Sequence, residues 1–102
     1  MNITVIGDYT SPQYQNLLQR VRMALPEEQI LDLSSHRTGS WKKMCNARFE
    51  DIFRSHKVII GNGWRTNIDA RRDITYAQEL QKECLIEIDG TYRPFPEYAR
   101  EI

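Results

Sequence analysis

The sequence has no net charge, no long apolar segment and no recognisable targeting segment. Fourteen Lys and Arg residues balance fourteen Asp and Glu residues, so the chain lacks the basic field that non-specific binding to duplex nucleic acid requires. No stretch approaches the roughly 18 consecutive apolar residues of a membrane span, and the N-terminus does not resemble a signal peptide. We therefore expect a cytoplasmic protein with a small-molecule ligand, no membrane partner and no duplex nucleic acid partner.

Cysteine is also scarce. Cys45 and Cys84 are far apart in the sequence and lie within apolar patterns. They form neither a Cys-x-x-Cys pair nor a metal-ligand spacing, and His36 and His56 have no Cys or carboxylate beside them to complete a metal site. We expect reduced cysteines that pack in the core, with no metal and no cofactor.

What is present is a regular alternation of strand and helix patterns through a single domain, residues 1–102. Strands are expected at 3–6, 30–33, 58–60 and 84–88, and helices at 14–25, 41–53 and 70–80. The order βαβαβαβ predicts an α/β fold with a single doubly wound parallel sheet of four or five strands, a flavodoxin-like or Rossmann-like three-layer sandwich. In the aromatic and Pro-rich tail, 90–102, the prolines argue against a regular helix or a central strand.

Ligands of such sheets bind beyond the carboxyl ends of the strands. The loop after the first strand leads into a helix N-terminus, where free N–H groups favour anions. We expect Gly7, Tyr9, Thr10 and Ser11 of this loop to bind substrate. The alternative for Ser11 is a plain helix cap.

The loop 34–40 is a second candidate. Its hydroxyl side chains, together with His36 and Arg37, could cradle a phosphate or a ribose. The P-loop pattern is absent, and the alternative is a solvated loop. If this loop binds phosphate, the substrate is a nucleotide rather than a nucleoside.

The predicted third helix carries a carboxylate where an apolar residue is expected. At about 100° per residue, Asp73 falls within the apolar arc of Ala70, Ile74 and Ala77. A carboxylate turned toward a sheet is costly unless it is hydrogen-bonded, paired or open to a polar cavity. We expect Asp73 to face a ligand cleft. The alternative is a one-residue error in helix phase, which would leave Asp73 partly exposed and paired with Arg65 or a neighbouring loop.

The segment around this carboxylate resembles the nucleoside 2-deoxyribosyltransferase-like proteins, whose small members carry a Gly-Trp-x-x-Ser-x-Gly-Ala-x-x-Glu motif. The chain has GWRTNIDARRD at these positions, with Asn67 in place of the Ser and Asp69 in place of the Gly. The order of strands and helices agrees over almost the whole chain. The matching residues are Gly63, Trp64, Ala70, Tyr76, Ala77, Leu80 and Lys82.

The resemblance implies that Asp73, which stands in place of the motif's Glu, attacks C1′ of a deoxyribose and expels the base. It also implies subunits that associate near their sites, hence a homo-oligomer. A carboxylate can stabilise or capture the oxocarbenium-like transition state of glycosidic cleavage. Asp is one methylene shorter than Glu, and its oxygens would lie about 1.5 Å further back, a displacement that can slow a reaction.

A departing base also needs an acid or a hydrogen-bond donor. Among the candidates at this edge of the sheet we favour Asp8 as a second catalytic residue. The alternative for Asp8 is a turn residue that ends the first strand.

Trp64 follows the third strand, where its ring could stack on a base, and Arg65 could meet a phosphate or pair with Asp69. The remaining residues predicted to bind substrate are Asn62, Gly63, Asp69 and Tyr76. The function expected is cleavage or transfer of the N-glycosidic bond of a nucleoside or nucleotide. The alternatives are a non-catalytic nucleotide-binding or sensing module on the same fold and, more remotely, a flavin carrier.

Overall fold

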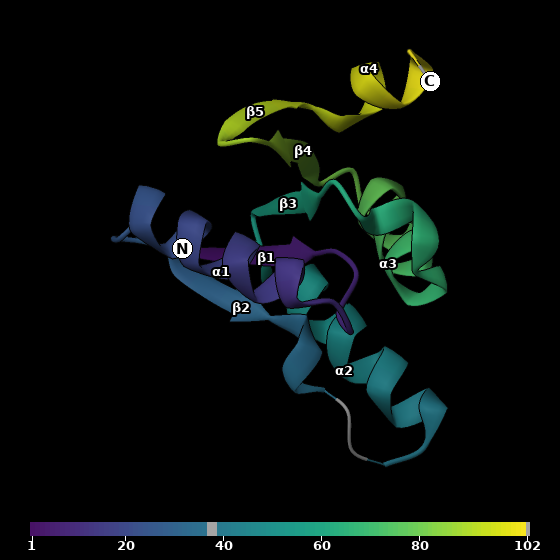
Figure 1. Ribbon diagram of the computed structural model, residues 1–102. Helices are drawn as coiled ribbons and strands as arrows, with labels where there is room; N and C mark the ends of the chain where they lie inside the picture. The colour runs from purple at the N-terminus through teal and green to yellow at the C-terminus, as the bar shows by residue number, and fades with distance from the viewer. Residues whose placement is uncertain (37–38, 102) are drawn as a thin grey trace.

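The computed structural model describes residues 1–36 and 39–101, which form a five-stranded sheet with helices packed against it (Figure 1). The strands are β1 (Asn2–Ile6), β2 (Gln29–Asp32), β3 (Lys57–Gly61), β4 (Glu83–Ile88) and β5 (Thr91–Pro94). The helices are α1 (Pro12–Ala24), α2 (Trp41–Arg54), α3 (Ile68–Glu79) and the short α4 (Phe95–Arg100). Two 3-10 turns, η1 (Leu33–Ser35) and η2 (Trp64–Thr66), follow β2 and β3.

The strand order is β2-β1-β3-β4-β5. The first four strands are parallel, which confirms the α/β alternation, but β5 is antiparallel to β4. The prediction of a purely parallel sheet is therefore wrong at one edge. The reason is a two-residue turn, Asp89 and Gly90, at φ 51° and 83°, a conformation typical of hairpins that reverse the chain at once.

The tail also differs from its prediction, because it contains both an edge strand and a helical turn. Pro94 ends β5 and Pro96 lies in the first turn of α4, two positions where a missing N–H costs little. Phe95 is buried and meets the Trp64 ring edge-on, with 5.1 Å between the ring centroids. The tail thus packs on its own domain.

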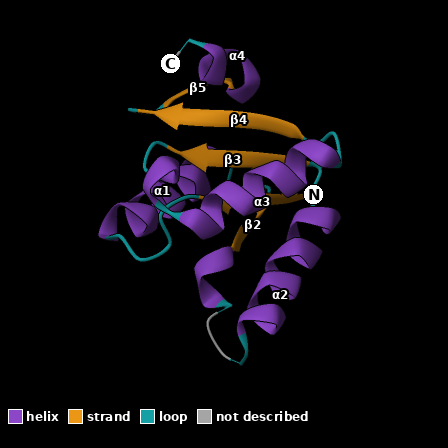
Figure 2. Ribbon diagram, turned by 90° about the vertical axis from the view of Figure 1, so that its right-hand side faces the viewer, coloured by secondary structure: helices purple, strands orange, loops and turns teal. Residues whose placement is uncertain are grey.

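The helices cover both faces of the sheet. Thr4 and Cys84 pair with the same β3 residue and so share a face, on which Thr4 Oγ1 donates to the Asp51 carbonyl of α2. Glu87, three residues beyond Cys84, points to the other face and binds Arg20 of α1. Figure 2 shows α3 on the same side as α2, whereas α1, which binds Glu87, lies on the opposite face.

The predicted core is largely confirmed. The three apolar residues of β3, Val58 to Ile60, are buried, as a central parallel strand requires. The inward stripe of α2 is narrower than predicted: Cys45 and Ile52 are buried, but Trp41 and Phe53 are exposed. These two aromatic rings lie on the solvent side of α2, where cations of Arg72 and Lys82 cover them.

Candidate functional site

Two clefts open along the carboxyl edge of the sheet, one on each side of the loop after β1. The first cleft, of about 330 Å³, lies between α1 and the loops after β1, β3 and β4. The second cleft, of about 290 Å³, lies between η1, α2 and the start of α3. Because β2 and β3 lie on opposite sides of β1 in the sheet, the loops after β1 and β3 flank the point where strand order reverses, which is where such folds bind ligands.

The predicted substrate-binding residues divide between these clefts. Gly7, Ser11, Asn62 and Gly63 line the first cleft, together with Asp8, which was predicted to be catalytic. Tyr9, Thr10, His36 and Asp69 line the second.

Three further predicted residues line neither cleft. Trp64 packs on Phe95, and Arg65 is exposed and lies over the Trp64 ring. Tyr76 stacks on Phe49 of α2, with 4.4 Å between the centroids. Arg37 lies outside the described residues.

The polar side chains of the loop between β1 and α1 are hydrogen-bonded to neighbouring residues. The Asp8 carboxylate accepts hydrogen bonds from the Thr10 hydroxyl at 2.9 Å and from Asn67 Nδ2 at 3.0 Å. Hydrogen bonds from Asn67 and then Thr10 lower the pKa of Asp8, and Ser11 Oγ accepts from the Gln13 N–H as the cap of α1. The plain cap, the alternative reading of Ser11, is therefore what the structure has.

At the floor of the first cleft, two glycines allow the backbone to lie close against side chains of α1. A Cβ on Gly61 would lie 2.6 Å from Leu17 Cδ2, and one on Gly7 would lie 3.1 Å from Tyr14 Cδ1. Glu87 forms one wall and is 2% exposed, with both carboxylate oxygens bound by Arg20 at 2.6 and 3.2 Å. This cleft therefore has a closely packed floor and a carboxylate with both oxygens hydrogen-bonded.

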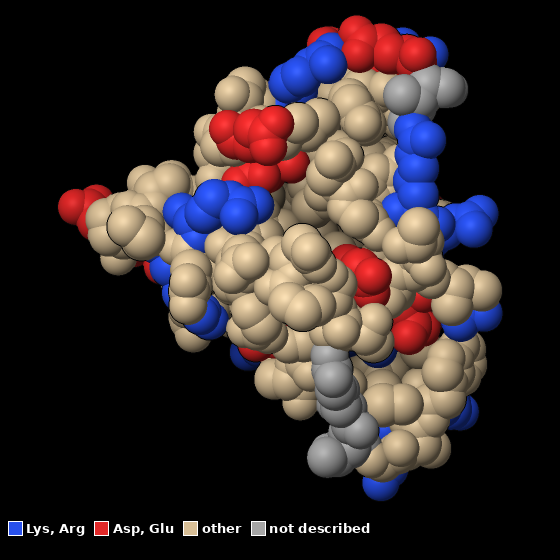
Figure 3. Space-filling model, in the orientation of Figure 1, with Lys and Arg blue, Asp and Glu red and all other residues tan. Residues whose placement is uncertain are grey.

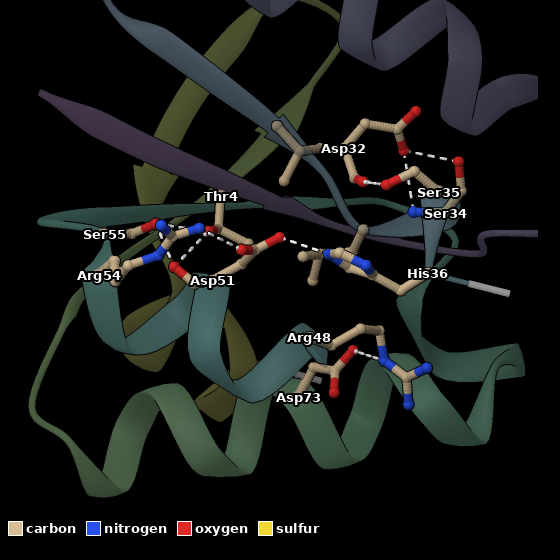
Figure 4. Close-up of polar contacts among 12 residues, drawn as sticks. Thr4, Asp32, Ser34, Ser35, His36, Arg48, Asp51, Arg54, Ser55 and Asp73 are labelled. Carbon is tan, nitrogen blue, oxygen red and sulfur yellow. Dashed lines mark hydrogen bonds and ion pairs between the residues drawn. The ribbon is translucent and has the colours of Figure 1, made fainter. Parts of the chain in front are cut away.

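Asp73 is fully buried beside the second cleft. Its Oδ2 accepts hydrogen bonds from the Tyr9 hydroxyl at 2.6 Å and from Arg48 Nε at 2.9 Å (Figure 4). Its Oδ1 has no hydrogen-bond partner among the described residues. The alternative reading, a partly exposed Asp73 paired with Arg65, is wrong, because Asp73 pairs with Arg48 of α2.

The environment of Asp73 changes its protonation. Burial raises the pKa of Asp73 to about 6, and the hydrogen bond from Tyr9 and the charge of Arg48 act against that rise. Burial and the charge of Asp73 raise the pKa of Tyr9 well above its usual value. Tyr9 is therefore a neutral donor, and Asp73 can exchange its proton near physiological pH.

Tyr9 and Arg48 separate Asp73 from the second cleft. Both line that cleft and both bind Asp73 Oδ2, whereas Asp73 itself has no exposed surface. Arg48 also lies 3.4 Å from the Asp69 carboxylate at the start of α3. A ligand in the second cleft would reach Asp73 only after the Tyr9 ring or the Arg48 side chain moves.

Sequence reasoning missed Arg48 as the partner of Asp73, although a signal was present. Arg48 lies three residues after Cys45 and four before Ile52, both of which are buried, so the helical period places it on the inward face of α2. An arginine at such a position requires an acidic partner. The sequence offered many carboxylates, and the period alone did not select Asp73 among them.

No protein-family model, curated protein or solved structure matches the chain. The fold and the site define an α/β protein with a mixed five-stranded sheet and two polar clefts at its carboxyl edge. In the described ranges, 1–36 and 39–101, no helix is long and apolar enough to cross a membrane. On the face shown in Figure 3, acidic and basic side chains are interspersed rather than gathered into a field of one sign.

Proposed function

We propose that the protein binds a nucleoside or nucleotide in the second cleft and cleaves or transfers its N-glycosidic bond, with Asp73 as the nucleophile. The observation that carries this proposal is the buried Asp73 carboxylate, whose Oδ1 has no partner among the described residues and whose Oδ2 binds Tyr9 and Arg48, two residues that line the cleft. A buried carboxylate without a full set of hydrogen bonds is costly. Such groups are found preferentially at functional sites.

The chemistry suits this environment. Cleavage of an N-glycosidic bond develops positive charge on the sugar, and a carboxylate can stabilise or capture that charge. With a pKa raised to about 6, Asp73 is mostly ionised near neutral pH. Once the ligand displaces Tyr9, Asp73 Oδ1 could form the bond to C1′ while Arg48 holds Oδ2.

Sugar binding would use the polar rim of the second cleft. Asp69 and Asn67 at the start of α3 and Thr10 after β1 line this rim, and carboxylate, amide and hydroxyl oxygens accept hydrogen bonds from sugar hydroxyls. The ligand would displace the Tyr9 ring, which is 7% exposed. Closure of the site around a bound sugar would then exclude water.

A homo-oligomer is part of the proposal. Trp41 and Ile68, at the starts of α2 and α3, are 56% and 63% exposed, and Met44 and Asp69 close to them in sequence line the second cleft. Exposed large apolar residues near a site suit a subunit contact. Light scattering should give a mass above that of one chain, and a Trp41→Ser, Ile68→Ser variant should return it to the monomer; a monomeric parent would contradict this part.

The decisive experiment is release of free base from a panel of nucleosides, deoxynucleosides and their monophosphates, followed by chromatography. We expect release by the parent and loss to the background level in Asp73→Asn. Glu79→Gln is the matched control, because it alters an exposed carboxylate on the same helix that lines neither cleft and keeps Asp73. Full activity of Asp73→Asn would exclude Asp73 as the nucleophile.

A second candidate function is a non-catalytic nucleotide-binding module. The observation that favours it is the ion pair with Arg48, which leaves Asp73 with no exposed surface. In that case one member of the panel should raise the melting temperature without turnover. Base release by the parent would exclude this second function.

A further inference from the structure

A histidine and an aspartate form a close pair at the second cleft. His36, which caps η1, lines the cleft, and its Nε2 lies 2.6 Å from Asp51 Oδ2 of α2. The His36 side chain is 29% exposed, whereas that of Asp51 is 11% exposed. A buried carboxylate thus holds the imidazole (Figure 4), and His36 also lines the cleft.

The pairing fixes the tautomer of the imidazole. An ionised carboxylate only accepts hydrogen bonds, so Nε2 must carry a hydrogen and donate the hydrogen bond to Asp51. Nδ1 is then the atom that gains or loses a proton, and it has no protein partner among the described residues. This is the arrangement in which a second residue orients a histidine for proton transfer.

Asp51 is itself held firmly. Its Oδ1 accepts a hydrogen bond from Arg54 at 2.8 Å. Its main-chain carbonyl accepts from the hydroxyls of Thr4 on β1 and Ser55 at the end of α2. The main chain of Asp51 is therefore tied to β1 through Thr4, and its carboxylate is held by Arg54, as Figure 4 shows.

We propose that His36, oriented by Asp51, is the acid that protonates the departing base in the second cleft. This inference rests on the proposed function and adds the residue that the leaving group needs. As the C1′–N bond breaks, its electron pair goes to the base, the Nδ1 proton of His36 moves to a base nitrogen, and Asp73 Oδ1 bonds to C1′. In the second half, neutral Nδ1 takes a proton from the water or acceptor base that attacks C1′ and releases Asp73.

The position of His36 favours it over Asp8 as the acid. Asp8 lies in the first cleft, on the other side of the loop after β1, and its hydrogen bonds stabilise the ionised form. His36 shares the second cleft with Tyr9 and Arg48, the two residues that cover Asp73. An acid and a nucleophile must approach one substrate from within one cleft.

The charged groups around His36 come from several elements. Asp51 balances an imidazolium directly, and Arg54 shares that carboxylate. Arg48 of α2 and Asp69 of α3 line the same cleft and pair with each other. Asp32 at the end of β2 binds the Ser34 hydroxyl and main-chain N–H.

The test compares two leaving groups. A neutral purine nucleoside needs a proton on its base to depart, whereas the same nucleoside methylated at N7 already carries the positive charge. We expect His36→Gln to lower base release from the neutral nucleoside by about 10²- to 10⁴-fold, the usual contribution of general acid catalysis, and to change release from the methylated one by less than about 10-fold. Asp73→Asn should abolish both.

Two further variants keep the test interpretable. Asp51→Asn should reproduce the selective loss in a milder form, because a neutral amide no longer stabilises the imidazolium. His56→Gln is the matched control, since its Nδ1 bonds the Asn2 carbonyl at the amino end of the sheet, and we expect both activities to be unchanged. Melting temperatures of all variants identify any that fail to fold.

The outcomes separate the two proposals. If the parent is active and His36→Gln loses both activities equally, or neither, the acid role is wrong while the proposed function stands. If the parent releases base from neither nucleoside, the proposed function is wrong, and the acid role of His36, which rests on it, is wrong as well. Selective loss with the neutral nucleoside supports both.

Discussion

The two clefts each border a buried carboxylate that is paired with an arginine, yet the two pairs differ in how fully they are satisfied. Glu87 beside the first cleft has both oxygens bound by Arg20, whose side chain is 50% exposed. Asp73 beside the second cleft receives one bond from Arg48, which is 5% exposed, and keeps one oxygen without a partner. Both oxygens of the Glu87 carboxylate therefore have a hydrogen-bond partner, whereas one oxygen of Asp73 has none among the described residues.

This difference separates a structural ion pair from a candidate nucleophile. The bidentate pair of the half-exposed Arg20 joins α1 to β4 at modest cost. A fully buried carboxylate with a raised pKa is retained in spite of its cost. We therefore expect the two pairs to respond very differently to the same substitutions.

The largest effect is expected from Arg48→Met. This change leaves Asp73 buried without its cation, which typically costs about 3–5 kcal/mol of unfolding free energy near neutral pH. The cost should shrink at about pH 5, where Asp73 takes up a proton. Urea unfolding measures the unfolding free energy at both pH values. Arg20→Met is the control, and we expect it to lose less stability because solvent reaches the Arg20–Glu87 pair. Equal losses in the two variants would contradict the comparison.

The pH dependence of stability should distinguish Asp73 from Asp8. The pKa of Asp73 in the folded state, about 6, lies above its ordinary value of 3.8, so the folded state binds more protons between these values. Stability from this group is present at low pH and is lost as pH rises through about 6, by on the order of 3 kcal/mol.

The measurement is the difference in unfolding free energy between the parent and Asp73→Asn, followed from about pH 4 to about pH 7.5. We expect the parent to lose stability relative to the variant over this range. Asp8→Asn should show no such trend, because the pKa of Asp8 is lowered and its contribution is lost only in stronger acid. A flat difference for Asp73→Asn would argue against its raised pKa.

Gly61→Ala should affect the first cleft alone. The new methyl would lie 2.6 Å from Leu17 Cδ2 in a buried contact, and such overpacking costs about 1–3 kcal/mol. The double variant Gly61→Ala, Leu17→Ala should be more stable than the sum of the two single losses predicts. Base release, if it belongs to the second cleft, should persist in folded Gly61→Ala.

The smallest effect is expected from Glu87→Gln. The amide oxygen can still accept one bond from Arg20, so the variant exchanges a charged hydrogen bond for a neutral one, at a cost of about 1 kcal/mol. Thermal unfolding at several salt concentrations measures it. A loss as large as that of Arg48→Met would show that the first pair is as poorly solvated as the second.

Much of the fold was predictable from local pattern. The apolar run 58–60 predicted a central strand, and the helical period placed Asp73 inside the apolar arc of α3, where the structure has it. The antiparallel β5 was missed, because the prolines of the tail suggested irregular chain and the turn at Asp89 and Gly90 was not interpreted as a hairpin. Local sequence patterns therefore predicted the parallel strands and the longer helices but not the antiparallel edge strand β5.

The candidate site was predictable only in part. The loops that carry it follow from the strand positions, but the sequence does not indicate that neighbours such as Asp8 and Tyr9 line opposite clefts. It also gives no sign that His36 meets Asp51, since the two are 15 positions apart in the sequence. Each of these facts depends on which side of the sheet a helix packs.

The sequence by itself determined the alternation of strands and helices, the absence of net charge and the position of Asp73 within the apolar arc of its helix, because these depend on residue types at short spacing. Only the tertiary structure decided that Arg48 and Tyr9 satisfy one oxygen of Asp73 and that the other has no partner in the part of the chain that the structure describes. It also decided which loop residues share a cleft. The physical reason is that hydrogen bonds and ion pairs act over a few ångströms in space, and packing of α2 against α3 brings together residues that the chain keeps apart.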